Sequence, residues 1–292
     1  MDTNAETWMD EEISALREGI SVRRPTQSQS MFKYVSLNTK KSWEYFAETI
    51  TTGILRGATS QSLNDPFEME PHVFDDLRPS VVQRIYGLGG FAEKIRNRRN
   101  PKAKPIDAND LETHRKSAER YLNSVRKDYR IISFCERFDS PLLWSHYANS
   151  YRGACIHFLG RSFPRSRGLS GYVEYSSFRP VYPLSLALHL QAEKDQRTTS
   201  SSRLRQIESE KIHFFTKANE WAYENEIRIV YNSRHHRGLE FDRQGLASII
   251  VAPRMPEKDR DRIQSIVNAS DIPNLHIREA KLSSTSFSVE IN

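Results

Sequence analysis

Residues 130–158 read RIISFCERFDSPLLWSHYANSYRGACIHF and place a short helix between two apolar strands. Strands are predicted over 130–136 and 154–158, because both runs are rich in β-branched and aromatic residues. Ser140-Pro141 is typical of a helix start, and Gly153 follows the helical stretch. The short helix departs from the roughly 30-residue βαβ rhythm of a doubly wound parallel sheet. The stretch therefore favours strands that pair mostly antiparallel.

Elements of the same kinds recur on both sides of this stretch. Further strands are predicted at FKYVSL (32–37), GYVEYSS (171–177), EIRIVY (226–231), SIIVAP (248–253), LHIREA (275–280) and SFSVEI (286–291). Helices are predicted over 3–19, 41–53, 80–98, 109–127, 201–221 and 256–268. The short strands and unequal insertions predict an α+β fold with a mixed, mostly antiparallel central sheet, flanking helices and a helical insertion.

The domain organisation is expected to be simple. Residues 1–30 carry six acidic and three basic residues and read as an acidic helix followed by a linker. Residues 31–292 are expected to form a single α+β domain, with a basic helical insertion around 80–128.

Composition excludes several classes of protein. The 292 residues include 14 Phe, 12 Tyr and 4 Trp, which is too many for a disordered chain. There is no apolar run of about 18 residues, so no membrane span is expected, and the acidic start is unlike a secretory signal. Two cysteines, Cys135 and Cys155, exclude a disulfide scaffold and a four-cysteine zinc site. We expect a cytoplasmic protein without a metal.

The formal net charge is +6, and its most basic block is KIRNRRNPKAK, from Lys94 to Lys104. A compact basic strip attracts a phosphate backbone and releases its counterions, which predicts nucleic-acid binding. The alternative is a solvated loop, which Pro101 and Pro105 favour. The candidate nucleic-acid contacts are Lys94, Arg96, Arg98, Arg99, Lys102 and Lys104.

The run WAYENEIRIVY, residues 221–231, contains the strongest candidate for chemistry. If it is a strand throughout, its period of two puts Glu224, Glu226 and Arg228 on one face. An exposed row of salt bridges is one interpretation. In the other, a half-buried cleft edge lets the arginine keep one carboxylate ionised while its neighbour meets a ligand.

Three shorter clusters could bind a ligand. Trp144, His146 and Tyr147 share a short helix and could wall a planar ring, although aromatic residues on a helix are more often core. Asn64 and Asp65 precede a proline, where a structural turn is the plain alternative. The third cluster is the pair Lys33 and Tyr34, on the opening strand.

In this order the motifs resemble a bacterial family, the domain of unknown function 2971. The resemblance covers roughly residues 31–256 and is carried by FKYVSL, SLNDPFE, SFCERFDSPLLWSHYANSYRGACIHF, WAYENEIRIVY and SIIVAPRM. Each motif is modest alone, but their order and spacing are fairly specific.

The family is similar to ADP-ribosyltransferase-like folds of toxins and phage defence, and this similarity implies an NAD-dependent transferase acting on nucleic acid or protein. NAD would be the co-substrate, and a neutralising partner protein would be a further expectation. Carried over by position, the resemblance implies the following roles: catalytic, Glu226 with Glu224; NAD contacts, Lys33, Tyr34, Asn64, Asp65, Trp144, His146, Tyr147 and Arg228.

Two other functions stay open. One is a non-catalytic nucleic-acid-binding or regulatory module that uses the Lys94–Lys104 block. The other is a metal-independent nuclease or hydrolase using His146 and the carboxylates. The transferase needs Trp144, His146 and Glu226 around one pocket, so their placement discriminates between these functions.

Overall fold

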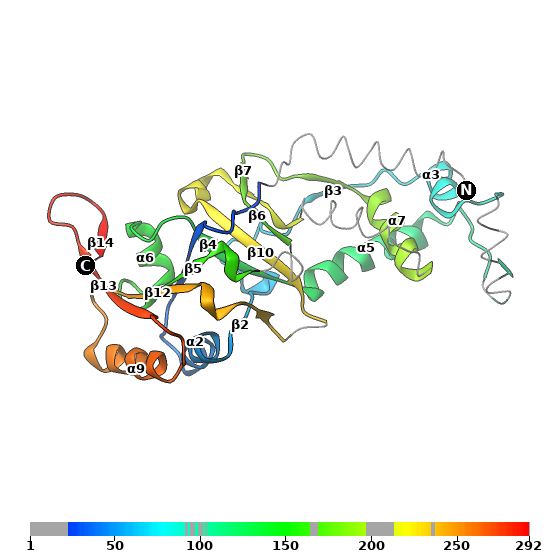
Figure 1. Ribbon diagram of the computed structural model, residues 1–292. Coiled ribbons are helices and arrows are strands. Elements are labelled where there is room, and N and C mark those ends of the chain that lie inside the picture. Colours follow the sequence, from blue (N-terminus) through cyan, green and yellow to red (C-terminus); the bar gives the residue numbers. More distant parts are fainter. Residues whose placement is uncertain are drawn as a thin grey trace. The chain divides into compact units, whose positions relative to one another are not determined.

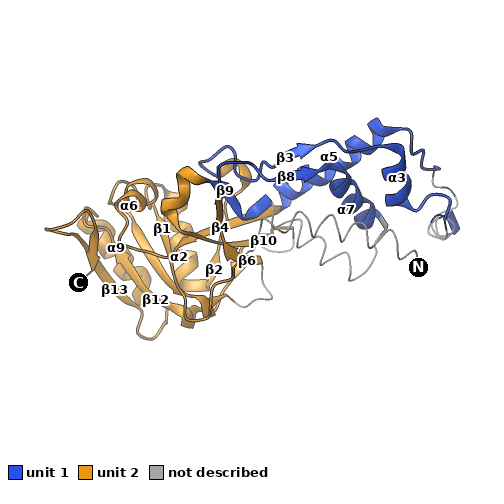
Figure 2. Ribbon diagram, turned by 90° about the horizontal axis from the view of Figure 1, so that it is seen from above, with its two compact units in different colours: residues 1–22, 63–128, 176–218 blue, residues 23–62, 129–175, 219–292 orange. Residues whose placement is uncertain are grey.

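A computed structural model describes residues 23–291 except for 91–92, 94–96, 99–101, 103, 164–168, 197–212 and 235–236. The expected helix over 3–19 lies outside the described residues. The chain forms two compact units (Figure 2). Unit 1 contains residues 63–128 and 176–218 of the described chain, and unit 2 contains 23–62, 129–175 and 219–292. The expected insertion around 80–128 belongs to unit 1.

Unit 2 is built on an eight-stranded sheet with the order β14-β13-β12-β5-β1-β4-β10-β6. All of its pairs are antiparallel except β12 with β13, which is parallel. The α+β fold with a mixed, mostly antiparallel sheet is therefore confirmed. The strands are β1 (Ser30–Val35), β4 (Tyr129–Cys135), β5 (Ala154–Leu159), β6 (Leu169–Tyr172), β10 (Glu226–Asn232), β12 (Leu246–Val251), β13 (His276–Leu282) and β14 (Val289–Ile291).

The central strands are the ones that the sequence marks most clearly. β12, β5, β1, β4 and β10 are consecutive neighbours in the sheet, and each was predicted from its apolar or alternating residues. Their side chains supply much of the core, including Ile132, Phe134, Ile156 and Ile249, all essentially inaccessible to solvent. Burial of such side chains is the main favourable contribution to folding.

Three helices cover this sheet. Figure 1 shows α2 (Lys40–Thr52) and α9 (Glu257–Asn268) below it and α6 (Pro141–Tyr147) above it. The Arg262 guanidinium of α9 lies 4.3 Å from the ring centre of Trp43 in α2, which joins the two helices. α2 begins with a capping box at Thr39 and ends at Gly53, whose φ of 72° suits glycine.

A left-handed turn follows α6. Asn149, Ser150 and Tyr151 have φ values of 49°, 52° and 67°, which are unusual for residues other than glycine. The turn returns the chain to β5 through Gly153, where an added Cβ would lie 2.1 Å from the Val35 carbonyl oxygen. The SHYANSYRG run is thus dictated by a tight connection between helix and strand.

The remaining elements of unit 2 are short. They are β2 (Ile54–Leu55), β11 (Leu239–Glu240) and the 3-10 helices η1 (Ser60–Ser62), η2 (Gly160–Ser162), η4 (Asn219–Glu224) and η5 (Arg243–Gly245). β2 and β11 form a separate two-stranded sheet. β7 (Glu174–Ser176) contains the point in the chain, between Tyr175 and Ser176, at which unit 2 gives way to unit 1.

Unit 1 is mainly helical in its described part. Its elements are β3 (His72–Phe74), α3 (Pro79–Tyr86), α5 (Leu111–Asp128), β8 (Val181–Pro183), α7 (Leu184–Gln196) and β9 (Thr216–Ala218). α5 packs on α7, and β3 pairs in parallel with β8. α5 matches the helix predicted over 109–127, whereas α7 was not predicted.

The helix predicted over 201–221 is wrong in its described part. Residues 213–214 are helical, but Thr216–Ala218 form β9, and a 3-10 helix follows. Lys217 is buried and paired with Glu68, and this tertiary contact outweighs the local helix propensity of the run. Residues 201–212 lie outside the described part.

No helix in the described residues is long and apolar enough to cross a membrane. Cys135 and Cys155 are both buried and free. Burial raises the pKa of the Cys155 thiol well above its usual value, so this cysteine is a poor nucleophile.

Candidate functional site

The predicted pairing of Glu226 with Arg228 is present on β10. The Arg228 Nε donates to Glu226 Oε1 at 2.7 Å, and its Nη2 donates to Oε2 at 3.0 Å. Both side chains are inaccessible to solvent, with 0% and 2% of their surface exposed. The arginine holds the carboxylate by a bidentate, charge-assisted contact. This carboxylate faces the interior of unit 2.

Glu224 lies outside the strand, so the condition that would put it on one face with Glu226 and Arg228, a strand through the whole motif, does not hold. It is the last residue of η4, and Asn225, with a φ of 43°, separates it from β10. Its buried side chain accepts a hydrogen bond of 2.6 Å from the Tyr147 hydroxyl. Glu224 thus accepts from a tyrosine hydroxyl, and Glu226 accepts from a guanidinium.

Four rings form what we call the aromatic cluster: Trp221, Tyr223, His146 and Tyr147. Successive ring centres are 6.1 Å apart for Trp221 and Tyr223, and 6.5 Å apart for Tyr223 and His146. The ring of His146 also lies 6.3 Å from that of Tyr147. His146 is exposed and the other three are half-buried, so the cluster reaches the surface of unit 2.

The structure places Trp144 elsewhere. Its side chain is fully buried, its indole N–H donates to the Phe138 carbonyl oxygen at 2.5 Å, and its ring meets that of Tyr34 edge-on at 5.1 Å. Tyr34 is buried too and donates its hydroxyl hydrogen to the Arg137 carbonyl oxygen. We therefore assign Trp144 and Tyr34 to the core. The sequence analysis put them in separate clusters and gave both as NAD contacts.

The other predicted contacts with NAD are dispersed. Lys33 on β1 is half-buried and donates to the Ser133 carbonyl oxygen at 3.4 Å, and burial lowers the pKa of its ammonium group. Asn64 and Asp65 belong to unit 1, whereas the other predicted contacts belong to unit 2. Two pockets are lined by described residues, one in each unit, and neither is lined by Trp144, His146 or Glu226.

The predicted nucleic-acid contacts are described only in part. Arg98, Lys102 and Lys104 are exposed. Lys94, Arg96 and Arg99 lie outside the described residues. Within the described part of the chain, no group of three or more His, Cys, Asp or Glu residues could hold a metal ion.

Sequence reasoning missed Tyr223 and Trp221 as candidate ligand contacts. Both belong to the WAYENE run, but a continuous strand would put their rings on the apolar side of the sheet. In the structure the run is a 3-10 helix, whose tight turn brings Tyr223 next to His146. The unusual density of rings in the run was the available signal.

Residues 143–229 match the family model described as "Protein of unknown function (DUF2971)". The matched segment begins in α6 and ends in β10, so it contains the whole aromatic cluster and the Glu226–Arg228 pair. Comparison with curated proteins and with solved structures finds no match. Over residues 143–229, the comparison thus confirms the resemblance to the domain of unknown function 2971 family that the sequence predicts.

Proposed function

We propose that this protein is a non-catalytic binding module that recognises the bases of a single-stranded nucleic acid at the aromatic cluster. The proposal rests on a difference in burial between the carboxylates and the aromatic rings of the WAYENE run. The two carboxylates proposed for catalysis are buried and hydrogen-bonded, whereas the neighbouring rings reach the surface. Every base has a π face, so aromatic side chains bind single strands with little sequence preference.

Charge supports the same partner. The formal net charge of +6 attracts a polyanion, and Arg98, Lys102 and Lys104 of the basic block are exposed. Neutralised phosphates release counterions, so the logarithm of the binding constant should fall linearly with the logarithm of the salt concentration. Replacing these three basic residues by alanine should make that dependence shallower if the block contacts the backbone.

The aromatic cluster is tested by Tyr223→Leu and Trp221→Leu. Each is expected to weaken binding of a labelled single-stranded oligonucleotide by about tenfold, because stacking on one ring contributes about 1–3 kcal/mol per base. Fluorescence anisotropy at fixed salt measures the affinity. Phe287→Leu is the matched control, because Phe287 is a fully exposed ring outside the cluster. Equal affinities for the wild type and both cluster variants would refute this function.

A second candidate function is NAD-dependent ADP-ribosyl transfer in a defence or toxin context. It is favoured by one contact, the 2.6 Å hydrogen bond that links Glu224 to Tyr147 of the cluster. A ring that holds nicotinamide, next to a carboxylate, is the arrangement that could stabilise positive charge developing on a ribose. Burial of Glu224 is the reason that we rank this function second.

Labelled NAD, incubated with the protein and with nucleic acid or lysate, tests this candidate. Label transfer should occur with the wild type and should fall by at least about 100-fold in Glu224→Gln, which removes one preorganised charge. Glu220→Gln is the control, because Glu220 lies in the same 3-10 helix and is exposed. Absence of transfer to every target would leave the binding function alone.

A further inference from the structure

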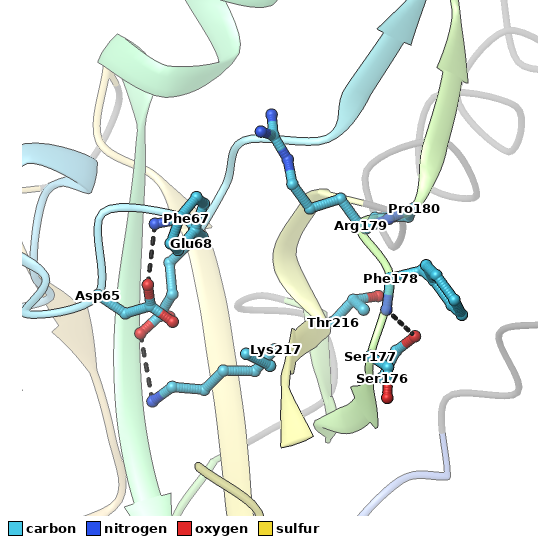
Figure 3. Close-up of a pocket in the computed structure, with 11 residues that line it drawn as sticks. Asp65, Phe67, Glu68, Ser176, Ser177, Phe178, Arg179, Pro180, Thr216 and Lys217 are labelled. Carbon is cyan, nitrogen blue, oxygen red and sulfur yellow. Dashed lines mark hydrogen bonds and ion pairs between the residues drawn. The ribbon is translucent and has the colours of Figure 1, made fainter. Parts of the chain in front are cut away.

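Unit 1 contains a pocket of about 240 Å³ that the aromatic cluster does not share. Three segments line it: residues 65–68, residues 176–180 and β9. Figure 3 shows Asp65, Phe67 and Glu68 on one wall, Phe178 and the two serines on the opposite wall, and Thr216 and Lys217 between them. All of these residues belong to unit 1.

The pocket has three buried charged groups. Lys217 Nζ lies 3.2 Å from Glu68 Oε1, and these two side chains are 3% and 2% exposed. Asp65, 5% exposed, accepts a hydrogen bond of 2.9 Å from the backbone N–H of Phe67. Among the described residues, Asp65 has no cationic partner within 4.0 Å. Among the described buried side chains that line the pocket, one cation against two carboxylates leaves a net charge of −1.

A negative charge at its buried end makes the pocket selective for a positively charged ligand. Removing an ionised carboxylate from water is costly unless a counter-charge or hydrogen bonds replace the lost hydration. Asp65 has one backbone donor, so a ligand that brings a positive charge would meet an incompletely compensated group. The Thr216 Oγ1 atom, which is buried and has no hydrogen-bond partner among the described residues, could accept another N–H from the same ligand.

The two phenyl rings suggest the rest of the ligand. Phe67 and Phe178 are 62% and 84% exposed and lie on opposite walls. Aromatic faces pack on flat apolar groups and attract cations, so both rings could contact such a ligand. Arg179 is the competing cation at the rim. Its exposed guanidinium lies 6.0 Å from the ring centre of Phe67 and donates to the carbonyl oxygens of Glu70 and Pro71, but it makes no ion pair with Asp65 among the described residues.

We propose that this pocket binds a small organic ammonium compound with a flat apolar body. The ammonium group contacts Asp65, and the apolar body contacts Phe67 and Phe178. Glu68 and Lys217 hold the carboxylate wall in place because their mutual pairing satisfies both charges without using Asp65. This is a ligand site in addition to the base-binding function.

Three probes of similar shape and different charge test the proposal on the full chain. Phenethylamine has an ammonium group at neutral pH, 2-phenylethanol is neutral, and 3-phenylpropionate is an anion. Isothermal titration calorimetry should show phenethylamine binding about tenfold more tightly than the alcohol, with the anion weakest. Equal affinities for the three probes, or no binding of any of them, would overturn the proposal.

Two variants link the binding to named residues. Asp65→Asn keeps an oxygen that can accept the Phe67 N–H, so the turn should persist, but it should abolish the preference for the amine over the alcohol. Its control is Asp110→Asn, because Asp110 is an exposed cap at the start of α5 and asparagine caps equally well.

Phe178→Ala should weaken phenethylamine several-fold without affecting folding, because the ring is exposed, and Phe287→Ala is its control. Unchanged amine preference in Asp65→Asn would refute the site even if Phe178→Ala had an effect. None of these residues belongs to the aromatic cluster, so failure here leaves the base-binding proposal untouched, and the reverse also holds.

Discussion

Replacement of Arg228 by methionine is expected to lower the free energy of unfolding by about 3–5 kcal/mol. The guanidinium is fully buried and makes two hydrogen bonds to the Glu226 carboxylate, at 2.7 and 3.0 Å. Methionine matches the length of the arginine stem but leaves a buried carboxylate without its counter-charge. Leaving such a group uncompensated costs much more than the net contribution of an intact pair.

The double variant Glu226→Met with Arg228→Met removes both charges, so it distinguishes the effect of an unpaired carboxylate from the effect of a changed side-chain shape. It should recover most of the lost stability, because a buried ion pair replaced by apolar side chains is often neutral or stabilising. Urea unfolding followed by tryptophan fluorescence reports mainly on unit 2, because three of the four tryptophans, Trp43, Trp144 and Trp221, belong to it. A double variant as unstable as Arg228→Met would show that the charge pair is not the cause.

Arg137→Met is the control, because it breaks an ion pair that is exposed to solvent and not buried. Arg137 also makes a bidentate contact, at 2.8 and 2.7 Å to the Asp139 carboxylate, but its side chain is 63% exposed. Water screens such a pair, so its loss should cost less than about 1 kcal/mol. Wild-type stability in Arg228→Met would contradict the structural role and return Glu226 to the list of candidate catalytic groups.

The strands of the sheet were predictable because each carries its own signal. β5 and β12 are apolar apart from His157 and Ser248, and β10 alternates, which put Glu226 and Arg228 on one face. Alternation indicates which residues share a face but says nothing about what covers that face. In the structure β10 is buried on both sides from Glu226 to Tyr231, so a polar face that resembled a cleft edge lies inside the unit.

Local breaks were harder to predict. Nothing in WAYENEIR indicates that Asn225 takes a positive φ and ends a 3-10 helix, so a strand that includes Glu224 stayed open as an interpretation. Lys217 was assigned to a helix because its neighbours have helical spacing. Its burial with Glu68 depends on a segment almost 150 residues away in sequence, which periodicity cannot detect.

Trp144 could be read from the sequence either as a core residue or as a ligand contact. Its replacement by alanine is expected to lower the free energy of unfolding by about 3–5 kcal/mol. The side chain is fully buried against Tyr34, and the cavity left by an indole cannot close without moving β1 or α6. The Phe138 carbonyl oxygen would also lose its donor. Trp144→Phe keeps much of the apolar volume and should cost less.

Trp221→Leu gives the matched comparison, since this ring is half-buried and belongs to the aromatic cluster. Urea unfolding and oligonucleotide affinity, measured on the same proteins, should then respond differently to the two variants. Trp144→Phe should lower stability and leave affinity unchanged, whereas Trp221→Leu should lower affinity with a smaller loss of stability. The reverse pattern, with Trp144→Phe fully stable and unable to bind, would mean that the Trp144 ring meets a ligand and that the core assignment is wrong.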